Sequence, residues 1–173
     1  MPVLPIEKRT RRGSIMIELQ NLNGFEAFSK VSDSVEITKD SEKFLSEVTE
    51  IFTTIYLKNV NQRNYITLIH AVTGTTCLRS LLPHLSANTG QKMLRYGWQM
   101  AAALYSISAS GSTNNLPEAK EIKRDELIDR AAVSNEEHAI KFTEACLREY
   151  ALNPKIIYLQ AAQDALGRLG SFD

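Results

Sequence analysis

Apolar residues recur every three or four positions over several long stretches of the chain, which is the spacing of an amphipathic helix. The clearest stretch begins at Thr38 or Asp40, with charged residues on its opposite face, and a weaker one covers Ser14–Leu22. We expect the first to cover the core from outside. Its apolar positions are Phe44, Leu45, Val48, Ile51, Phe52, Ile55 and Tyr56.

Two further stretches lack a charged face altogether. No Asp, Glu, Lys or Arg occurs between Arg63 and Arg79, and none from Tyr96 to Pro117. Helices without charges have no natural solvent-facing side, so we expect both to be almost fully buried. The central one should begin after Asn64 as N-cap and stop at Pro83. So much interior in a short chain suggests oligomerisation, or a covering segment that this sequence lacks.

The C-terminal part predicts three more helices. One covers Glu118 to Ala132, with Ile128 directed inward, and follows a loop from Ser106 to Pro117. The next should start at a capping box, with Ser134 as N-cap and Glu137 reaching back. Asn153-Pro154 then caps a last helix that ends near Gly167 or Gly170. We find no alternating strand pattern, so residues 1–173 are expected to form one all-α domain, a compact bundle of about seven helices.

Composition narrows the range of partners. Twenty Lys and Arg balance 20 Asp and Glu, so neither nucleic acid nor an anionic membrane is expected as a partner. No apolar segment is long enough to cross a bilayer. Cys77 and Cys146 form no paired motif, which indicates a reducing compartment, and we expect a cytoplasmic protein. Residues 1–12 form a short basic arm, which we expect to be solvated or packed at an edge; phosphate or RNA binding through it is a weaker hypothesis.

Three residues are candidates for chemistry. His70 lies in the charge-free central stretch with Gly74 one turn along, where a glycine leaves space for another helix or for something else. A hydrogen-bonded core histidine and a functional one are equally consistent with this position. His138 and Lys141 stand three apart on one helix face and could supply a metal ligand or a general base beside an ammonium group. The competing interpretation for His138 is packing beside the helix cap. For Lys141 it is a position on the solvated face of the helix.

These three residues lie in two of four sequence blocks whose order and spacing resemble the questin oxidase-like family. The match extends from Pro2 to Leu169 and corresponds to the C-terminal portion of longer family members. The blocks are LIHAVTG at 68–74, LRSLLPHL at 78–85, WQMAA at 98–102 and EHAIKFTEA at 137–145.

The resemblance implies an oxidoreductase that opens rings of anthraquinone-type polyketides with oxygen, in a Baeyer–Villiger-like (monooxygenase) or dioxygenase reaction. It implies non-haem iron, with His70 as one ligand, His138 as a second, and Lys141 as a carboxylated ligand or charged neighbour. The substrate would be an aromatic polyketide or quinone-like small molecule. NADPH is a conceivable electron donor, although the chain has no motif to bind it. A partner would be a second copy or a missing N-terminal half.

A rival hypothesis belongs to a different functional class. The chain would be a non-catalytic helical interaction module from a truncated or split gene, dimerising through its apolar helices, with His70 as a hydrogen-bonded core residue. Metal content and oligomeric state discriminate between the two hypotheses.

Overall fold

The computed structural model describes residues 1–10, 14–37, 40–109, 113–118 and 121–170, and within these ranges it is all-α. Six helices have nine or more residues, and short helical turns connect them. The predicted fold class is confirmed. The elements are η1 (Ile6–Lys8), α1 (Ile15–Gln20), α2 (Glu26–Ser29), η2 (Val31–Ser34), α3 (Ser41–Asn59), α4 (Tyr65–Thr76), α5 (Leu78–Leu81), η3 (Leu82–His84), α6 (Ala87–Ser108), α7 (Arg124–Ala132), α8 (Glu137–Leu152) and α9 (Ile156–Leu169).

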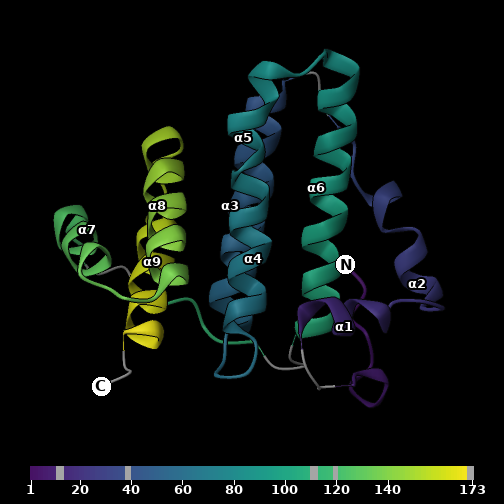
Figure 1. Ribbon diagram of the computed structural model, residues 1–173, viewed down its shortest axis with the longest axis horizontal. Helices are drawn as coiled ribbons and strands as arrows, with labels where there is room; N and C mark the ends of the chain where they lie inside the picture. The colour runs from purple at the N-terminus through teal and green to yellow at the C-terminus, as the bar shows by residue number, and fades with distance from the viewer. Residues whose placement is uncertain (11–13, 38–39, 110–112, 119–120, 171–173) are drawn as a thin grey trace.

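Helix α4 is the centre of the arrangement. It packs against α3, α6 and α8, and α8 in turn packs against α9. In Figure 1, α6 stands on one side of the α3–α4 pair and the α8–α9 pair on the other, with α7 at the outer edge. No residue of α4 is exposed, but only half of its twelve residues are fully buried. The expectation that this helix has no solvent-facing side is confirmed, and near-complete burial is not.

Helix α6 is covered on all sides only in its second half, although Gly90 and Leu94 of its first half are also buried. No residue from Gly97 to Ser108 is exposed, whereas Tyr96 keeps 63% of its surface exposed. The cover of both central helices comes from α3, α8 and the N-terminal residues of this same chain: Leu4 is fully buried, and its backbone N–H donates to the carbonyl of Ser106 at 2.9 Å. A missing segment is therefore not needed to cover these parts of the two helices, while oligomerisation stays a prediction. Of the basic arm, Arg11 and Arg12 lie outside the described residues.

Two glycines leave room for a side chain of a neighbouring helix: Gly74 of α4 faces Met100 of α6, and Gly97 of α6 faces Leu78 of α5. A methyl group on Gly74 would overlap the end of the Met100 side chain of α6, and one on Gly97 would lie 2.5 Å from Cδ1 of Leu78. Gly74 therefore makes room for the neighbouring helix, which was the simpler of the two interpretations.

The central helix ends earlier than predicted, at Thr76 rather than near Pro83. Consecutive side chains take up its carbonyl groups: Thr75 donates to Val72 at 2.8 Å, Thr76 donates to Thr73 at 3.0 Å, and Cys77 contacts the carbonyl of Gly74. Such side-chain bonds compete with the backbone ladder and bend helices. The chain then continues as α5 and η3, and Pro83 lies in η3.

At two helix starts the expected asparagine makes no capping bond; Asn64 does occupy the N-cap position of α4, as predicted. Asn64 precedes α4 but makes no cap bond, because its side chain accepts from the N–H of Asn61 and donates to the carbonyls of Asn59 and Ser108. Similarly, Asn153 donates to Glu50 at 3.3 Å, and Lys155 takes the N-cap position of α9. A side chain that is drawn to another helix cannot cap its own.

The starts of α7 and α8 also differ from the predicted positions. Helix α7 begins at Arg124, not Glu118, and Ile128 is 46% exposed rather than inward. The N-cap of α8 is Glu136, while the hydroxyl of Ser134 accepts from the N–H of Glu136, so the expected Ser134–Glu137 capping box is wrong. The carboxylate next to the helix start displaces the serine, because negative charge is favoured there.

A buried ion pair joins α5 to α8. The guanidinium of Arg79 donates twice to the carboxylate of Glu149, from Nε at 2.9 Å and from an Nη at 2.8 Å, and also contacts Glu42 and Ser46 of α3. Glu149 is fully buried, and the Arg79 side chain is 10% exposed. Burial lowers the pKa of Arg79, but its bonds to Glu149 and Glu42 outweigh that effect and raise it.

We expect Glu149→Ala to lower the free energy of unfolding by about 3 kcal/mol, because a largely buried guanidinium loses its bidentate buried partner and keeps only the exposed Glu42 as a counter-charge. The exposed pair Lys43–Glu47, 3.9 Å apart, provides the control, and Glu47→Ala should change stability by less than about 0.5 kcal/mol. Urea denaturation measures both variants. An equal loss of unfolding free energy in the two variants would mean that the buried pair stabilises the fold no more than the exposed one.

Gly97→Ala should destabilise by about 1 kcal/mol, because the misfit with buried Leu78 exceeds the gain in helix propensity. Gly167→Ala in α9 should instead stabilise by about 1 kcal/mol, since its methyl group would meet no heavy atom within 4 Å. Thermal unfolding of the two variants checks the pair. A gain for both would contradict the close helix contact at Gly97.

Candidate functional site

His70 and His138 lie against one another where α4 meets α8. Their ring centroids are 5.3 Å apart and the ring planes meet at 79°, an edge-to-face arrangement. Both side chains are partly buried. The structure thus brings together two of the three predicted site residues, from helices far apart in the sequence.

Glu136 positions His138. One carboxylate oxygen of Glu136 accepts from the backbone N–H of His138 at 3.3 Å and lies 2.6 Å from Nδ1 of the ring. A carboxylate only accepts, so Nδ1 carries the proton and, in the neutral ring, Nε2 keeps its lone pair. The bonds from His138 hold the pKa of Glu136 below its usual range, so this carboxylate is charged at neutral pH. The helix start therefore fixes both the ring and its tautomer.

His70 has a lowered pKa. Partial burial is the largest cause, followed by the charges of His138 and of Lys141. The imidazole is consequently uncharged at neutral pH and available as an acceptor or ligand.

Lys141 lies on the same face of α8 but is directed to solvent. Its ammonium group donates to Glu137 at 2.7 Å, and the two side chains are 64% and 65% exposed. This pairing lowers the pKa of Glu137. Lys141 is near enough to act on His70 through its charge, while its nitrogen is bound by Glu137.

A metal ion would find two suitable donors here. An imidazole whose other nitrogen donates to a carboxylate, as in His138, is the usual form of a ligating histidine. Over the described ranges, however, no three His, Cys, Asp or Glu side chains are grouped closely enough to hold a metal ion. Two imidazoles fall short of the three protein ligands that catalytic sites normally have. They fit part of an iron site, and the described residues do not complete it.

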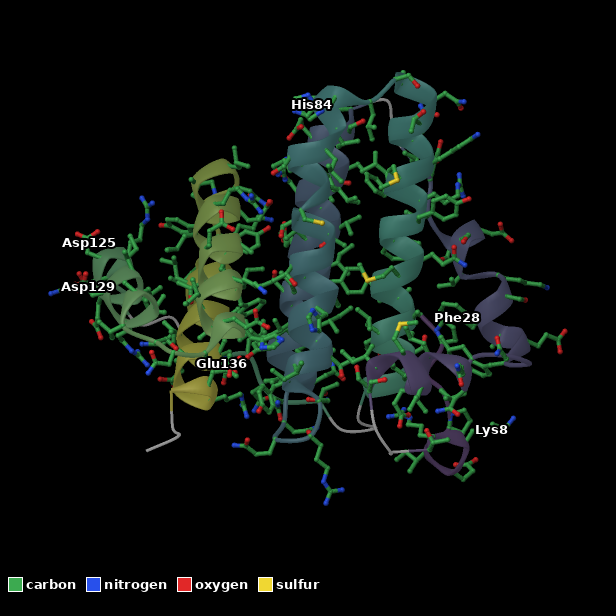
Figure 2. All side chains as sticks on the ribbon, viewed as in Figure 1. Lys8, Phe28, His84, Asp125, Asp129 and Glu136 are labelled. Atoms are coloured by element: carbon green, nitrogen blue, oxygen red, sulfur yellow. The ribbon has the colours of Figure 1, made fainter. Side chains whose placement is uncertain are left out.

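A groove of about 530 Å³ lies between α4–α5 and α8; Lys141 lines it, whereas His70 and His138 do not. Thr73, Cys77, Ser80, Lys141 and Arg148 are among its lining residues. His84 is remote: Figure 2 shows it at one end of the central helices, while Glu136 lies toward the other. Leaving His84 out of the site is consistent with this arrangement.

Sequence reasoning missed Glu136 as the partner of His138. The signal was present, because an acidic residue two positions before a histidine at a helix start can bond both its N–H and its ring. It was overlooked because Ser134 and Glu137 match the capping-box pattern.

Compared with protein-family models, curated proteins and solved structures, the chain matches none. The resemblance to the questin oxidase-like family therefore stays a prediction. Within the part of the chain that the structure describes, no helix combines the length and apolarity needed to cross a membrane.

The lowered pKa of His70 predicts a pH dependence of stability. The unfolded chain binds this proton at about the ordinary value of 6.5, and the folded chain binds it only at lower pH. The stabilising contribution is thus complete above pH 6.5 and declines as the pH falls toward the lower, folded pKa. Urea denaturation between pH 7.5 and about 5 should show this decline, and His70→Asn should reduce its slope. His84→Asn is the matched control, and an equal reduction by both variants would contradict the assignment.

Proposed function

We propose that this chain is a helical domain of a questin oxidase-like oxygenase, with His70 and His138 at the polar centre of its site. The convergence of the two imidazoles, 5.3 Å apart at the contact of α4 and α8, carries the proposal. The resemblance selects these two of the three histidines in the sequence, and the structure independently supports the selection.

His138 has the arrangement of a general base. Hydroxyquinones and related aromatic polyketides carry phenolic hydroxyl groups, whose ionisation makes the ring electron-rich. Nε2 of His138 would accept such a proton, and Glu136 at Nδ1 would stabilise the imidazolium that forms. Uncharged His70 would hydrogen-bond a substrate oxygen. Lys141, 64% exposed, would contribute positive charge at the mouth of the site.

Non-haem iron, when held by the two imidazoles, would supply activation of dioxygen. This role would replace the base role of His138, because Nε2 has a single lone pair and cannot bind iron and accept a proton at once. The described residues provide only these two donors, so we propose that a second copy or another chain completes the set. Lys141 could add a ligand only if carboxylated and released from Glu137. NADPH or a similar reductant would be needed for a monooxygenase reaction.

The test is elemental analysis of freshly purified protein for iron, zinc and manganese, beside the His70→Ala, His138→Ala double variant. We expect bound metal that the double variant loses and that His84→Ala retains. Oxygen consumption with a hydroxyanthraquinone should follow the same order. A metal content unchanged by the double variant would contradict the proposal.

Oligomeric state gives the second arm of the test. Absence of metal and of oxygen consumption, together with a stable dimer in size-exclusion chromatography with light scattering, would overturn the oxygenase proposal in favour of a helical interaction module. The faces of α4 and of the second half of α6 are covered within this chain, so such a dimer would form through other surfaces.

A further inference from the structure

A second groove lies between α7 and α8, and neither His70 nor His138 lines it. Its volume is about 460 Å³, within the range of small-molecule sites. Ile128 and Ile140 line it and are 46% and 44% exposed, and Ala132 and Leu147 add apolar surface. Apolar side chains left open to water in a concave surface are typical of a binding site for an apolar group.

The two ends of this groove differ in chemistry. Ala132 and Ile140 lie next to the short connection between α7 and α8, so that end is apolar. At the other end, the start of α7 meets the last turns of α8. Arg124 of α7 lies over the Tyr150 ring of α8, with Cζ 5.9 Å from the ring centroid. Arg148 of α8 also lines this end of the groove. The groove therefore runs from an apolar end to a basic end.

Two donors at the groove have no acceptor. The hydroxyl of Thr143, a residue only 1% exposed, and Nε of Arg148 are buried atoms without a hydrogen-bond partner in the described structure. The remaining contacts of the Arg148 guanidinium are long, at 3.5 Å to Glu144 and 3.5 Å to the carbonyl of Thr76. Buried donors left unpaired are costly, so their presence in a groove points to a missing acceptor.

The charge around this end favours an anion. Arg124 and Arg148 outnumber Glu144, whose side chain is 60% exposed. Three more carboxylates, Asp125, Glu126 and Asp129, belong to α7. Figure 2 shows Asp125 and Asp129 on its outer side, away from α8, and Glu126 is not among the residues that line the groove.

We propose that the α7–α8 groove binds an apolar monocarboxylate, such as a medium-chain fatty acid or an aromatic carboxylic acid. The carboxylate accepts hydrogen bonds from Arg148 and Thr143, with Arg124 adding charge, and the apolar part lies along Ile128 toward Ile140. A guanidinium and a hydroxyl are well suited to a carboxylate head, and the apolar end excludes a second charge. This site does not depend on the proposed oxygenase function.

Calorimetric titration of the full chain with decanoate, below its micelle-forming concentration, tests the proposal. Decanol has the same tail without the charge, and it should bind at least about tenfold more weakly. Arg148→Gln should weaken decanoate binding about tenfold and leave decanol binding nearly unchanged. Glu144→Gln should strengthen decanoate binding a few-fold by removing a like charge.

Thr143→Val provides a test that combines binding with stability. It should weaken decanoate binding about fivefold and yet raise the urea midpoint of the free protein, because it removes an unpaired buried hydroxyl. The control is Thr53→Val: Thr53 is equally buried, and its hydroxyl donates to the carbonyl of Thr49 at 2.8 Å. This variant should lower the midpoint and leave binding unchanged.

Three results would overturn the proposal. Equal affinity for decanoate and decanol would show a nonspecific apolar surface. Unchanged decanoate binding in both Arg148→Gln and Thr143→Val would show that these two side chains do not bind the carboxylate. Light scattering that shows a dimer unable to bind decanoate, and a monomer when Ile128→Asp is introduced, would show that the groove is a contact between copies of the chain.

Discussion

The bidentate pair between Arg79 and Glu149 constrains the whole arrangement, because it connects segments that are distant in the chain. Arg79 lies in α5 and also contacts Glu42 and Ser46 of α3, while Glu149 belongs to α8. A guanidinium in this environment must be fully engaged, and a buried carboxylate must be paired, so α8 has little freedom to slide along α3 and α5. His138 is carried by the same α8 helix. The ion pair therefore helps to set the distance between His138 and His70.

Helix α4 ends three residues before Arg79. Hydroxyl groups of Thr75 and Thr76 bond to carbonyls one turn back, and the chain turns into α5 immediately afterwards. A second polar contact connects α3 to α9: the hydroxyl of Tyr56 donates a hydrogen bond to Asp164 at 2.8 Å. Burial, more than the charge of Asp164, raises the pKa of this tyrosine, so it remains a donor throughout the physiological range. Polar pairs thus fix the positions of helices whose apolar packing alone would permit sliding.

The features that the sequence predicts well are those set by apolar pattern. The absence of charges around His70 predicts that α4 has no solvent-facing side, and the periodicity after Asp40 predicts α3, whose N-cap Asp40 accepts from Lys43. Helix ends are predicted less well, since Asn64 and Asn153 bond to residues in other segments instead of capping. The contact of His70 with His138 follows from packing between distant helices, and spacing within one helix does not encode it. The family resemblance paired the two residues, but it gave no hint of Glu136.

Helix α7 is held by little of its own surface. Its buried residues are Leu127 and Ala131, and its close neighbours among the described helices are α8 and α9. Figure 1 shows it at the edge of the bundle. Segments with few buried contacts open at a lower free energy than the fold as a whole unfolds. Amide hydrogens of α7 should accordingly exchange with solvent well before those of α4. The outermost helix would then behave as a separately opening unit, and the chain would hold a rigid interior and a loosely attached edge within one small domain.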